Sequence, residues 1–366
     1  MKINIVGDFF GQTGYANHTR QFANALNKLV EVSMECQKPQ NWVKYVNDDE
    51  LKMLLRNTND YDVRICITTP TYWKLFWNDD KPFIGVCVWE GDRIPMSWCK
   101  ILLDNKVSQI WCPSSHTRTA IRNTITEYNN FEQVLGKTFI IPHGVDLNIF
   151  YPKQMDRDKR FTFFANKGYR GMKDRGGLQY LFKAFKDEFK SNENVILLVK
   201  INTAYGVVNF QKEGELLKLN PNGAQIKLLA DNYSYERLND LYNQCDVFVT
   251  TSQAEAFNLP CLEAMACGKP VIATMFGGQS DYVNNSVGWQ LETGTSKEVT
   301  WDILYEGIEW KEPDIMEIRQ KLRYVYEHRD EVINKGNLAL SKAKELTWDN
   351  SAKLALENIK SISKIK

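Results

Sequence analysis

Two glutamates separated by seven residues, Glu255 and Glu263, stand where they could do chemistry. An apolar stretch at 246–250 precedes them, and Pro260 and Gly268 are typical of a helix start and a helix end. The first turn of such a helix leaves backbone N–H groups free, which makes an anion site suited to a diphosphate. A carboxylate beside that helix end can accept hydrogen bonds from ribose hydroxyls. The pattern therefore predicts a site for a nucleoside diphosphate.

Each glutamate also has an ordinary structural explanation. Glu255 alone is typical of a solvated loop acid, and Glu263 alone is a favourable charge near a helix N-terminus. The order of strand, loop, proline and helix, followed by Gly277 and Gly278 after the next apolar stretch, favours the binding site.

The spacing of the two glutamates resembles the E-x7-E signature of family 4 retaining glycosyltransferases, which have the two-domain GT-B fold. Residues 264–274, 141–146 and 346–348 also resemble that family. The resemblance implies that Glu263 binds the nucleotide ribose and that Glu255 contacts the donor sugar. It also implies that backbone amides near the helix start approach the donor phosphate and sugar. The residues of that segment are Ala256, Phe257, Asn258 and Leu259.

Two of these positions depart from the family pattern. The family usually carries glycines where Ala256 and Asn258 stand, so both replacements add a side chain near the donor. The departure bears on the pose of the sugar and leaves the predicted class of enzyme unchanged.

A donor diphosphate needs compensating positive charge, which a metal or basic side chains can supply. Asp-x-Asp strings, which hold a metal in other glycosyltransferases, occur at 60–62 and 156–158, where we expect them to be incidental. The segment 165–177 instead carries four cations and four glycines. Glycines allow close backbone approach, and arginine can contact two phosphate oxygens at once. We therefore predict no metal and no cofactor, with the nucleoside-diphosphate sugar as co-substrate.

In the family this loop supplies an Arg and a Lys to the diphosphate. Lys167 corresponds best to the family's strand-end Arg, and Arg175 corresponds best to its Lys at the helix start. Arg170 and Lys173 remain competitors, because the loop can be aligned in more than one register. A solvated basic loop is the structural alternative.

The first half contributes two further candidate segments. Gly11 and Gly14 follow the first apolar stretch and resemble the family's glycine-rich first loop, although an ordinary strand-to-helix turn also explains them. Glu90 stands where many family members place a histidine that contacts the donor sugar, in a segment that resembles a subgroup of the family. A structural turn in which Asp92 pairs with Arg93 is the alternative. The candidate catalytic residues are Glu90, Glu255, Arg175 and Lys167.

Alternating elements must position these residues. Apolar stretches in the first half predict strands at 2–6, 63–67, 83–88, 107–111 and 138–141, and helices at 15–29 and 114–123. The second half predicts strands at 161–165, 195–201, 225–229, 247–250, 271–274 and 287–291. Its predicted helices are 177–189, 235–244, 260–266 and a segment beyond residue 313. Short apolar strands separated by helices predict parallel sheets covered on both faces.

This order predicts an α/β chain of the GT-B class, with two doubly wound Rossmann-like domains facing a central cleft. The polar segment 151–160 is the expected linker. Residues 1–152 would form the acceptor-side domain and 153–346 the nucleotide-sugar-binding domain. Residues 347–366 would form a helix that packs back on the first domain.

Composition narrows the classes of function. The 366 residues are 43% hydrophobic and carry a net charge of +1, which argues against a binder that relies on a strongly basic face for nucleic acid. No apolar run approaches a membrane span, and the start is too quickly polar for a signal peptide. The eight cysteines include no Cys-x-x-Cys pair, as expected of a cytoplasmic protein.

Together these features predict a metal-independent, retaining glycosyltransferase, a hexosyltransferase that acts on an unknown hydroxyl of a glycan, lipid-linked or protein acceptor. One alternative is a nucleotide-sugar epimerase on the same fold. Another is a catalytically silent subunit that binds a nucleotide sugar. A dinucleotide oxidoreductase is disfavoured, because the first strand lacks a tight G-x-G-x-x-G turn.

Overall fold

The structure, a computed structural model, describes residues 1–366 except 12, 38–46, 79, 172, 203–208, 293 and 364–366. The chain forms two compact units, and neither is continuous in sequence. The first unit consists of Met1–Gly144, Val299–Ile308 and Leu346–Lys366. The second consists of Val145–Glu298 and Glu309–Glu345. The expected linker at 151–160 thus lies in the second unit, and the segment from Leu346 onward lies in the first.

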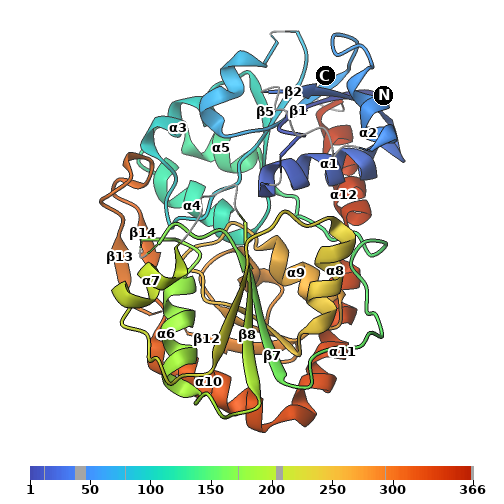
Figure 1. The fold of residues 1–366 in the computed structure, drawn as a ribbon. Helices are drawn as coiled ribbons and strands as arrows, with labels where there is room; N and C mark the ends of the chain where they lie inside the picture. The colour runs from blue at the N-terminus through green and yellow to red at the C-terminus, as the bar shows by residue number, and fades with distance from the viewer. Residues whose placement is uncertain are drawn as a thin grey trace. The chain divides into compact units, whose positions relative to one another are not determined.

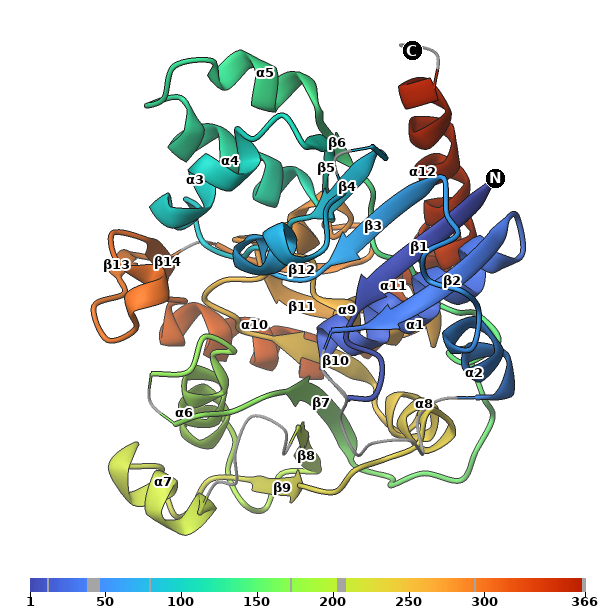
Figure 2. The same ribbon diagram turned by 90° about the horizontal axis from the view of Figure 1, so that it is seen from above.

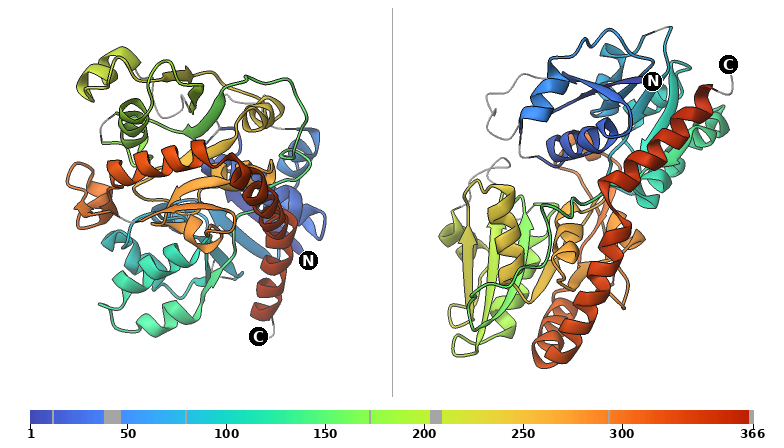
Figure 3. Two further views of the ribbon diagram at one scale, coloured as in Figure 1. Left: turned by 90° about the horizontal axis from the view of Figure 1, so that it is seen from below. Right: turned by 90° about the vertical axis from the view of Figure 1, so that its right-hand side faces the viewer.

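The first unit is built on a parallel sheet with the strand order β2-β1-β3-β4-β5-β6, seen side by side in Figure 2. The strands are β1 (Lys2–Gly7), β2 (Glu31–Cys36), β3 (Val63–Ile67), β4 (Phe83–Val86), β5 (Val107–Cys112) and β6 (Thr138–Ile140). The helices are α1 (Gly14–Asn27), α2 (Asp48–Leu54), α3 (Met96–Leu102), α4 (Ser115–Ile125), α5 (Phe131–Gly136) and α12 (Trp348–Ser363). Figure 3 shows α12 running alongside the other elements of this unit. Large buried rings, among them Trp73, Phe83 and Trp98, fill its core.

The second unit has its own parallel sheet, with the order β12-β11-β10-β7-β8-β9. The strands are β7 (Phe161–Lys167), β8 (Val195–Ile201), β9 (Gln225–Leu229), β10 (Val247–Thr250), β11 (Val271–Thr274) and β12 (Gly288–Leu291). The helices are α6 (Leu178–Glu188), α7 (Phe210–Leu216), α8 (Tyr235–Gln244), α9 (Leu259–Ala266), α10 (Ile315–Glu327) and α11 (Arg329–Glu345). Helices α6 and α10 cover one face of the sheet, and α8, α9 and α11 cover the other (Figure 1). Phe163, Phe182 and Phe185 are buried in the core under α6.

An antiparallel hairpin, β13 (Ser296–Glu298) and β14 (Glu309–Lys311), belongs to the second unit. The segment between its two strands belongs to the first unit. Short 3-10 helices lie at Pro70–Leu75, Gly278–Asp281 and Ile303–Tyr305. Among the described helices, none is both long enough and apolar enough to cross a bilayer.

The structure confirms the two predicted parallel sheets and corrects some of their limits. The strand expected at 83–88 ends at Val86, and the strand expected at 161–165 continues to Lys167. The sequence analysis missed β2, in which Glu31, Ser33 and Glu35 interrupt the apolar pattern, although Ser33 is buried. It also missed the short, charged strands of the hairpin.

Candidate functional site

The order of strands places a candidate site at the C-terminal ends of β7 and β10. These strands are neighbours although β8 and β9 lie between them in sequence, so the winding of the sheet reverses at this point. In open α/β sheets, ligands bind beyond the carboxyl ends of the strands at such a reversal. Lys167 is the last residue of β7, and Glu255 lies on the loop that follows β10.

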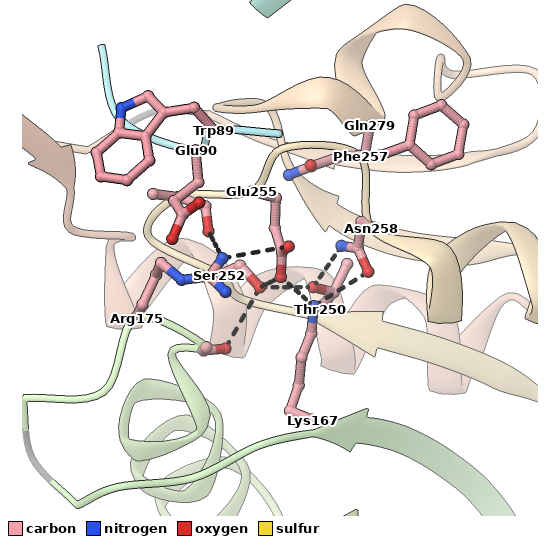
Figure 4. A network of polar contacts seen from close by, with 12 residues as sticks. Trp89, Glu90, Lys167, Arg175, Thr250, Ser252, Glu255, Phe257, Asn258 and Gln279 are labelled. Atoms are coloured by element: carbon pink, nitrogen blue, oxygen red, sulfur yellow. Dashed lines mark hydrogen bonds and ion pairs between the residues drawn. The ribbon is translucent and has the colours of Figure 1, made fainter. Parts of the chain in front are cut away.

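Glu255 is the centre of a compact polar cluster, shown in Figure 4. Its Oε1 accepts hydrogen bonds from Lys167 Nζ at 2.6 Å and from Ser252 Oγ at 3.0 Å. Its Oε2 lies 3.3 Å from Arg175 Nη1. Burial by itself raises the pKa of this carboxyl, but the charges of Lys167 and Arg175 outweigh it and lower the pKa to about 2. Two cations around one ionised carboxylate leave a net positive charge that attracts anions.

Backbone contacts fix Arg175 against the loop that carries Glu255. Arg175 Nη1 donates to the carbonyl of Ala254 at 2.6 Å, and Gln253 N donates to the carbonyl of Arg175 at 2.9 Å. Gly177, just before α6, has a left-handed φ of 74°, and a Cβ there would lie 1.8 Å from the oxygen of Thr251. The close approach of these two backbones therefore requires glycine at position 177.

The other two cations of the loop between β7 and α6 are exposed. Asp174 shapes this loop, because its two carboxylate oxygens accept from Gly176 N at 2.6 Å and from Arg170 N at 2.7 Å. The side chains of Arg170 and Lys173 lie at the surface, whereas the side chain of Lys167 is only 6% exposed. Of the four cations predicted for the site, the structure brings Lys167 and Arg175 to Glu255.

The start of α9 is held by contacts from the chain that follows β11. Tyr282 donates its hydroxyl proton to the carbonyls of Phe257 at 2.8 Å and Asn258 at 2.9 Å. A Cβ at Gly278 would lie 2.0 Å from the oxygen of Ala256, so glycine is required at this approach as well. Asn258 is the N-cap residue, with a left-handed φ of 72°, and Leu259 is the first residue of the helix.

Glu263 lies on α9 in a different environment and is 6% exposed. Its Oε2 accepts a hydrogen bond from the Tyr242 hydroxyl at 2.6 Å, and that hydroxyl accepts one from Asn166 Nδ2 at 3.0 Å. Burial raises the pKa of Glu263 to about 7, although the hydrogen bond from Tyr242 and the charge of Lys200 act in the opposite direction. The last two residues of β7 therefore support different glutamates. Asn166 supports Glu263 through Tyr242, and Lys167 contacts Glu255 directly.

Glu90, in the first unit, lies on the loop after β4. Its carboxylate accepts a hydrogen bond from the hydroxyl of Tyr305, and its carbonyl lies 2.8 Å from Nε2 of His116. The ring of Tyr305 stacks on Trp89 with the ring centroids 4.9 Å apart. Tyr305 comes from the 3-10 helix inside the β13–β14 connection, so no local pattern around Glu90 could have indicated this partner.

The glycine-rich first loop forms a capped turn from β1 into α1. Thr13 accepts a hydrogen bond from Ala16 N at 3.2 Å, and the carbonyl of Gly11 accepts one from Arg20 Nη1 at 2.8 Å. Among the described residues, none has an atom within 4 Å of a Cβ built at Gly14, so their packing does not require glycine there. These contacts are those of a strand-to-helix turn, and a role in donor binding remains a prediction.

The two Asp-x-Asp strings have structural partners. Lys2 pairs with Asp60, and its backbone N donates to Asp62 at 2.8 Å. Arg160 pairs with Asp158 at 2.6 Å. Within the described part of the chain, no three His, Cys, Asp or Glu side chains are grouped so as to hold a metal ion.

Sequence reasoning missed the polar residues that support the two glutamates. Ser252, Asn166 and Tyr242 were within the segments analysed, yet none was assigned a role. A polar residue at or just after the end of a buried parallel strand is a usable signal; Asn166 lies at the end of β7, and Ser252 lies two residues after β10. Tyr242 lies inside α8 and carries no such signal.

Comparison with known proteins gives a family match that lies mostly in the second unit. Residues 169–321 match the family described as Glycosyl transferases group 1. A probable sucrose-phosphate synthase of Thermosipho melanesiensis is 31% identical over 160 residues, which are 42% of this chain and 36% of that protein. The chain thus matches about a third of the length of this relative.

Solved structures resemble the chain along its whole length. A sucrose-phosphate synthase from Thermosynechococcus elongatus covers 100% of both chains with a TM-score of 0.71 and 14% identity. The HepE protein of Anabaena in complex with UDP-glucose covers 99% of this chain and 100% of its own, with a TM-score of 0.66 and 16% identity. These neighbours are GT-B proteins, and the chain has the GT-B fold with two Rossmann-like sheets.

Proposed function

Because residues 169–321 match the group 1 glycosyl transferases, we propose that this chain transfers a sugar from a nucleoside-diphosphate sugar to a hydroxyl acceptor. The observation that carries the proposal is the partly buried ion cluster of Glu255, Lys167 and Arg175 at the winding reversal of the second sheet. A cluster with one more cation than anions, beside a helix N-terminus, is suited to a diphosphate.

In this proposal the diphosphate lies at the N-terminus of α9. Free backbone N–H groups of the first turn and the positive end of the helix dipole would meet the phosphate oxygens. Lys167 and Arg175 would neutralise the charge that develops on the leaving diphosphate, the kind of stabilisation that usually contributes most to catalysis. Basic side chains would then do the work that a metal does in other enzymes of this class, so the transfer would be metal-independent.

The two glutamates take different parts of the donor in this scheme. Glu263 would accept hydrogen bonds from the ribose hydroxyls, because one of its oxygens is already fixed by Tyr242. Glu255, held ionised by Lys167 and Arg175, would accept hydrogen bonds from hydroxyls of the sugar. Glu90, in the first unit, is proposed to take the place of the family histidine.

The proposed step retains the configuration at the anomeric carbon. The bond from that carbon to the phosphate oxygen breaks, and its electron pair leaves with the nucleoside diphosphate. The acceptor oxygen forms the new bond on the same face, and its proton passes to a phosphate oxygen of the leaving group. The resemblance of Glu255 and Glu263 to the E-x7-E pattern supports retention.

The test begins with the identity of the donor. The HepE neighbour was solved with UDP-glucose, so UDP is the first nucleotide to titrate, followed by GDP and ADP. We expect one of them to bind by calorimetry, and its sugar conjugate to be hydrolysed slowly and transferred faster when a hydroxyl acceptor is added. Turnover should persist in EDTA; its loss would overturn metal independence. Donor consumption without any need for an acceptor would favour an epimerase, and binding without turnover would favour a silent subunit.

Variants then test the site itself. Arg175→Ala and Glu263→Ala should each weaken binding of that nucleotide roughly 10- to 100-fold, as expected for lost hydrogen bonds to charged groups. Arg170→Ala is the matched control, because it removes an exposed cation from the same loop. Unchanged binding in both test variants would overturn the proposed site.

A further inference from the structure

Asn258 has a left-handed backbone conformation, which is uncommon for any residue other than glycine. Its φ of 72° and ψ of 64° place it in the left-handed region, where glycine is the usual residue. It is one of three described non-glycine residues with a positive φ, and it is only 4% exposed. Asparagine tolerates this region better than most residues but still has a Cβ to accommodate. The side chain of Asn258 makes two hydrogen bonds that glycine could not make.

The side chain of Asn258 does not cap the helix that it precedes. Asparagine is among the best N-cap residues because its side chain can accept from the first backbone amides, yet no such bond is made here. Instead, its Oδ1 accepts from Lys167 Nζ at 3.0 Å, and its Nδ2 donates to Thr250 Oγ1 at 3.1 Å. Since an ammonium group can only donate, the amide oxygen must face Lys167, which fixes the orientation of the amide.

These bonds close a ring of five side chains, visible in Figure 4. Thr250 Oγ1 lies 3.1 Å from Ser252 Oγ, and Ser252 Oγ donates to Glu255 Oε1 at 3.0 Å. Lys167 then bridges Glu255 and Asn258 and completes the ring. Lys167 thus stands between a charged acceptor on one side and a neutral acceptor on the other.

We propose that Asn258 is a positioning residue that holds the ammonium of Lys167 for the donor diphosphate; this inference rests on the proposed function. A lysine ammonium has three N–H donors, and Glu255 and Asn258 take two of them in the described structure. With both acceptors in place, the third N–H has a fixed direction. Without Asn258, the ammonium turns about its single strong contact with Glu255, and the diphosphate loses a preoriented donor.

The experiment compares Asn258→Gly with the wild-type chain, using whichever of UDP, GDP and ADP binds. Glycine relieves the left-handed backbone and removes the side chain of Asn258 alone, so the folded state should be retained. We expect the affinity for the nucleoside diphosphate to fall about tenfold, as for one lost hydrogen bond to a charged group. The affinity for the matching nucleoside, measured by competition, should stay within twofold, within the ordinary scatter of about 0.4 kcal/mol.

A second variant keeps the test independent of Asn258 itself. Thr250→Val removes the partner that anchors the Asn258 amide, together with a contact to Ser252, and keeps the direct bond between Lys167 and Glu255. It should also weaken binding of the nucleoside diphosphate, but by less, about threefold. Binding of the nucleoside should again be unaffected. A general loosening of the fold would weaken binding of both ligands equally.

The outcomes separate the two proposals. If the wild-type chain binds none of the three diphosphates, the proposed function fails and this inference fails with it. If the wild-type chain binds and Asn258→Gly binds equally well, or loses nucleoside and diphosphate affinity to the same extent, only the positioning role of Asn258 is overturned.

Discussion

The side chain of Glu255 is 13% exposed and that of Glu263 is buried, and their surroundings differ in charge. Glu255 has two cations within 3.3 Å, and its pKa falls to about 2. Glu263 has a hydroxyl as its closest partner, and its pKa rises to about 7. At neutral pH the first is fully ionised, whereas the second is close to half protonated. Two glutamates of one motif therefore differ in protonation at neutral pH.

The pH dependence of stability should reveal the raised pKa of Glu263. Its pKa in the folded state lies above the ordinary value, so the folded state holds the proton more tightly than the unfolded state does. The resulting contribution to the free energy of unfolding is fully present below about pH 4.5. It is lost as the pH rises through about 7. The stability advantage of Glu263→Gln over wild type should therefore grow between pH 5 and 8, by roughly 3 kcal/mol. Urea denaturation of both chains across that range measures it, and parallel curves would contradict it.

Tyr242→Phe should move the same pH window upward. The hydrogen bond from Tyr242 lowers the pKa of Glu263, so its removal lets burial raise that pKa further above 7. The midpoint of the stability change should therefore shift to higher pH in the same denaturation series. Tyr305→Phe is a matched control, because it removes a hydroxyl that donates to Glu90 in the other unit. A midpoint that stays in place would show that the hydroxyl does not tune Glu263.

At the scale of elements, short runs rich in apolar residues predicted most strands well. The bounds of β3, β8, β9, β10 and β11 agree with the predicted ranges. The register of the loop 165–177 could not be predicted, because it depends on contacts with a segment much later in the chain. The carbonyl of Arg175 accepts from Gln253 N, and its side chain reaches the carbonyl of Ala254. Likewise, nothing local indicates that the side chain of Asn258 turns toward β7.

The junction between the loop and α6 gives a prediction at this scale. Gly177→Ala should destabilise the chain by about 3 kcal/mol or more, because the left-handed strain adds to a clash with the carbonyl of Thr251. Nucleotide binding should weaken as well, since Arg175 lies two residues earlier in sequence. Urea denaturation and calorimetric titration measure the two effects.

Gly214 in α7 provides the control for that change. Its nearest atom, Cδ1 of Leu219, would lie 3.8 Å from an added Cβ, which is an ordinary contact. Gly214→Ala should therefore leave stability unchanged or raise it by up to about 1 kcal/mol. Equal losses in the two alanine variants would contradict the prediction, because the close approach to Thr251 exists only at position 177.

At the scale of the whole molecule, the first unit is assembled from three separate segments. Two domains were predicted from the alternation of strands and helices, but the inclusion of Val299–Ile308 in the first unit was not. The reason is that the buried partners of this segment are distant in sequence: Ile308 joins the core that contains Trp89. A domain boundary drawn along the sequence cannot represent such a return of the chain.

The return of α12 to the first unit can be tested at Trp348, which is 5% exposed. Its ring stacks on His18 with centroids 5.4 Å apart, and a Cβ at Gly144 would lie 2.1 Å from its backbone N. Trp348→Ala should cost about 3–5 kcal/mol by opening a cavity in this cluster. Leu354→Ala, at a position 37% exposed on the same helix, should cost much less.

Because Trp348 belongs to the first unit, its loss should act unequally on the two units. Calorimetry of Trp348→Ala should show the melting of the first unit shifted to lower temperature, with nucleotide affinity, measured well below that transition, unchanged. Lys167, Arg175, Glu255 and Glu263 lie in the second unit, whose core contains neither Trp348 nor His18. If Trp348→Ala also lowered the nucleotide affinity, the folding of the second sheet would depend on α12.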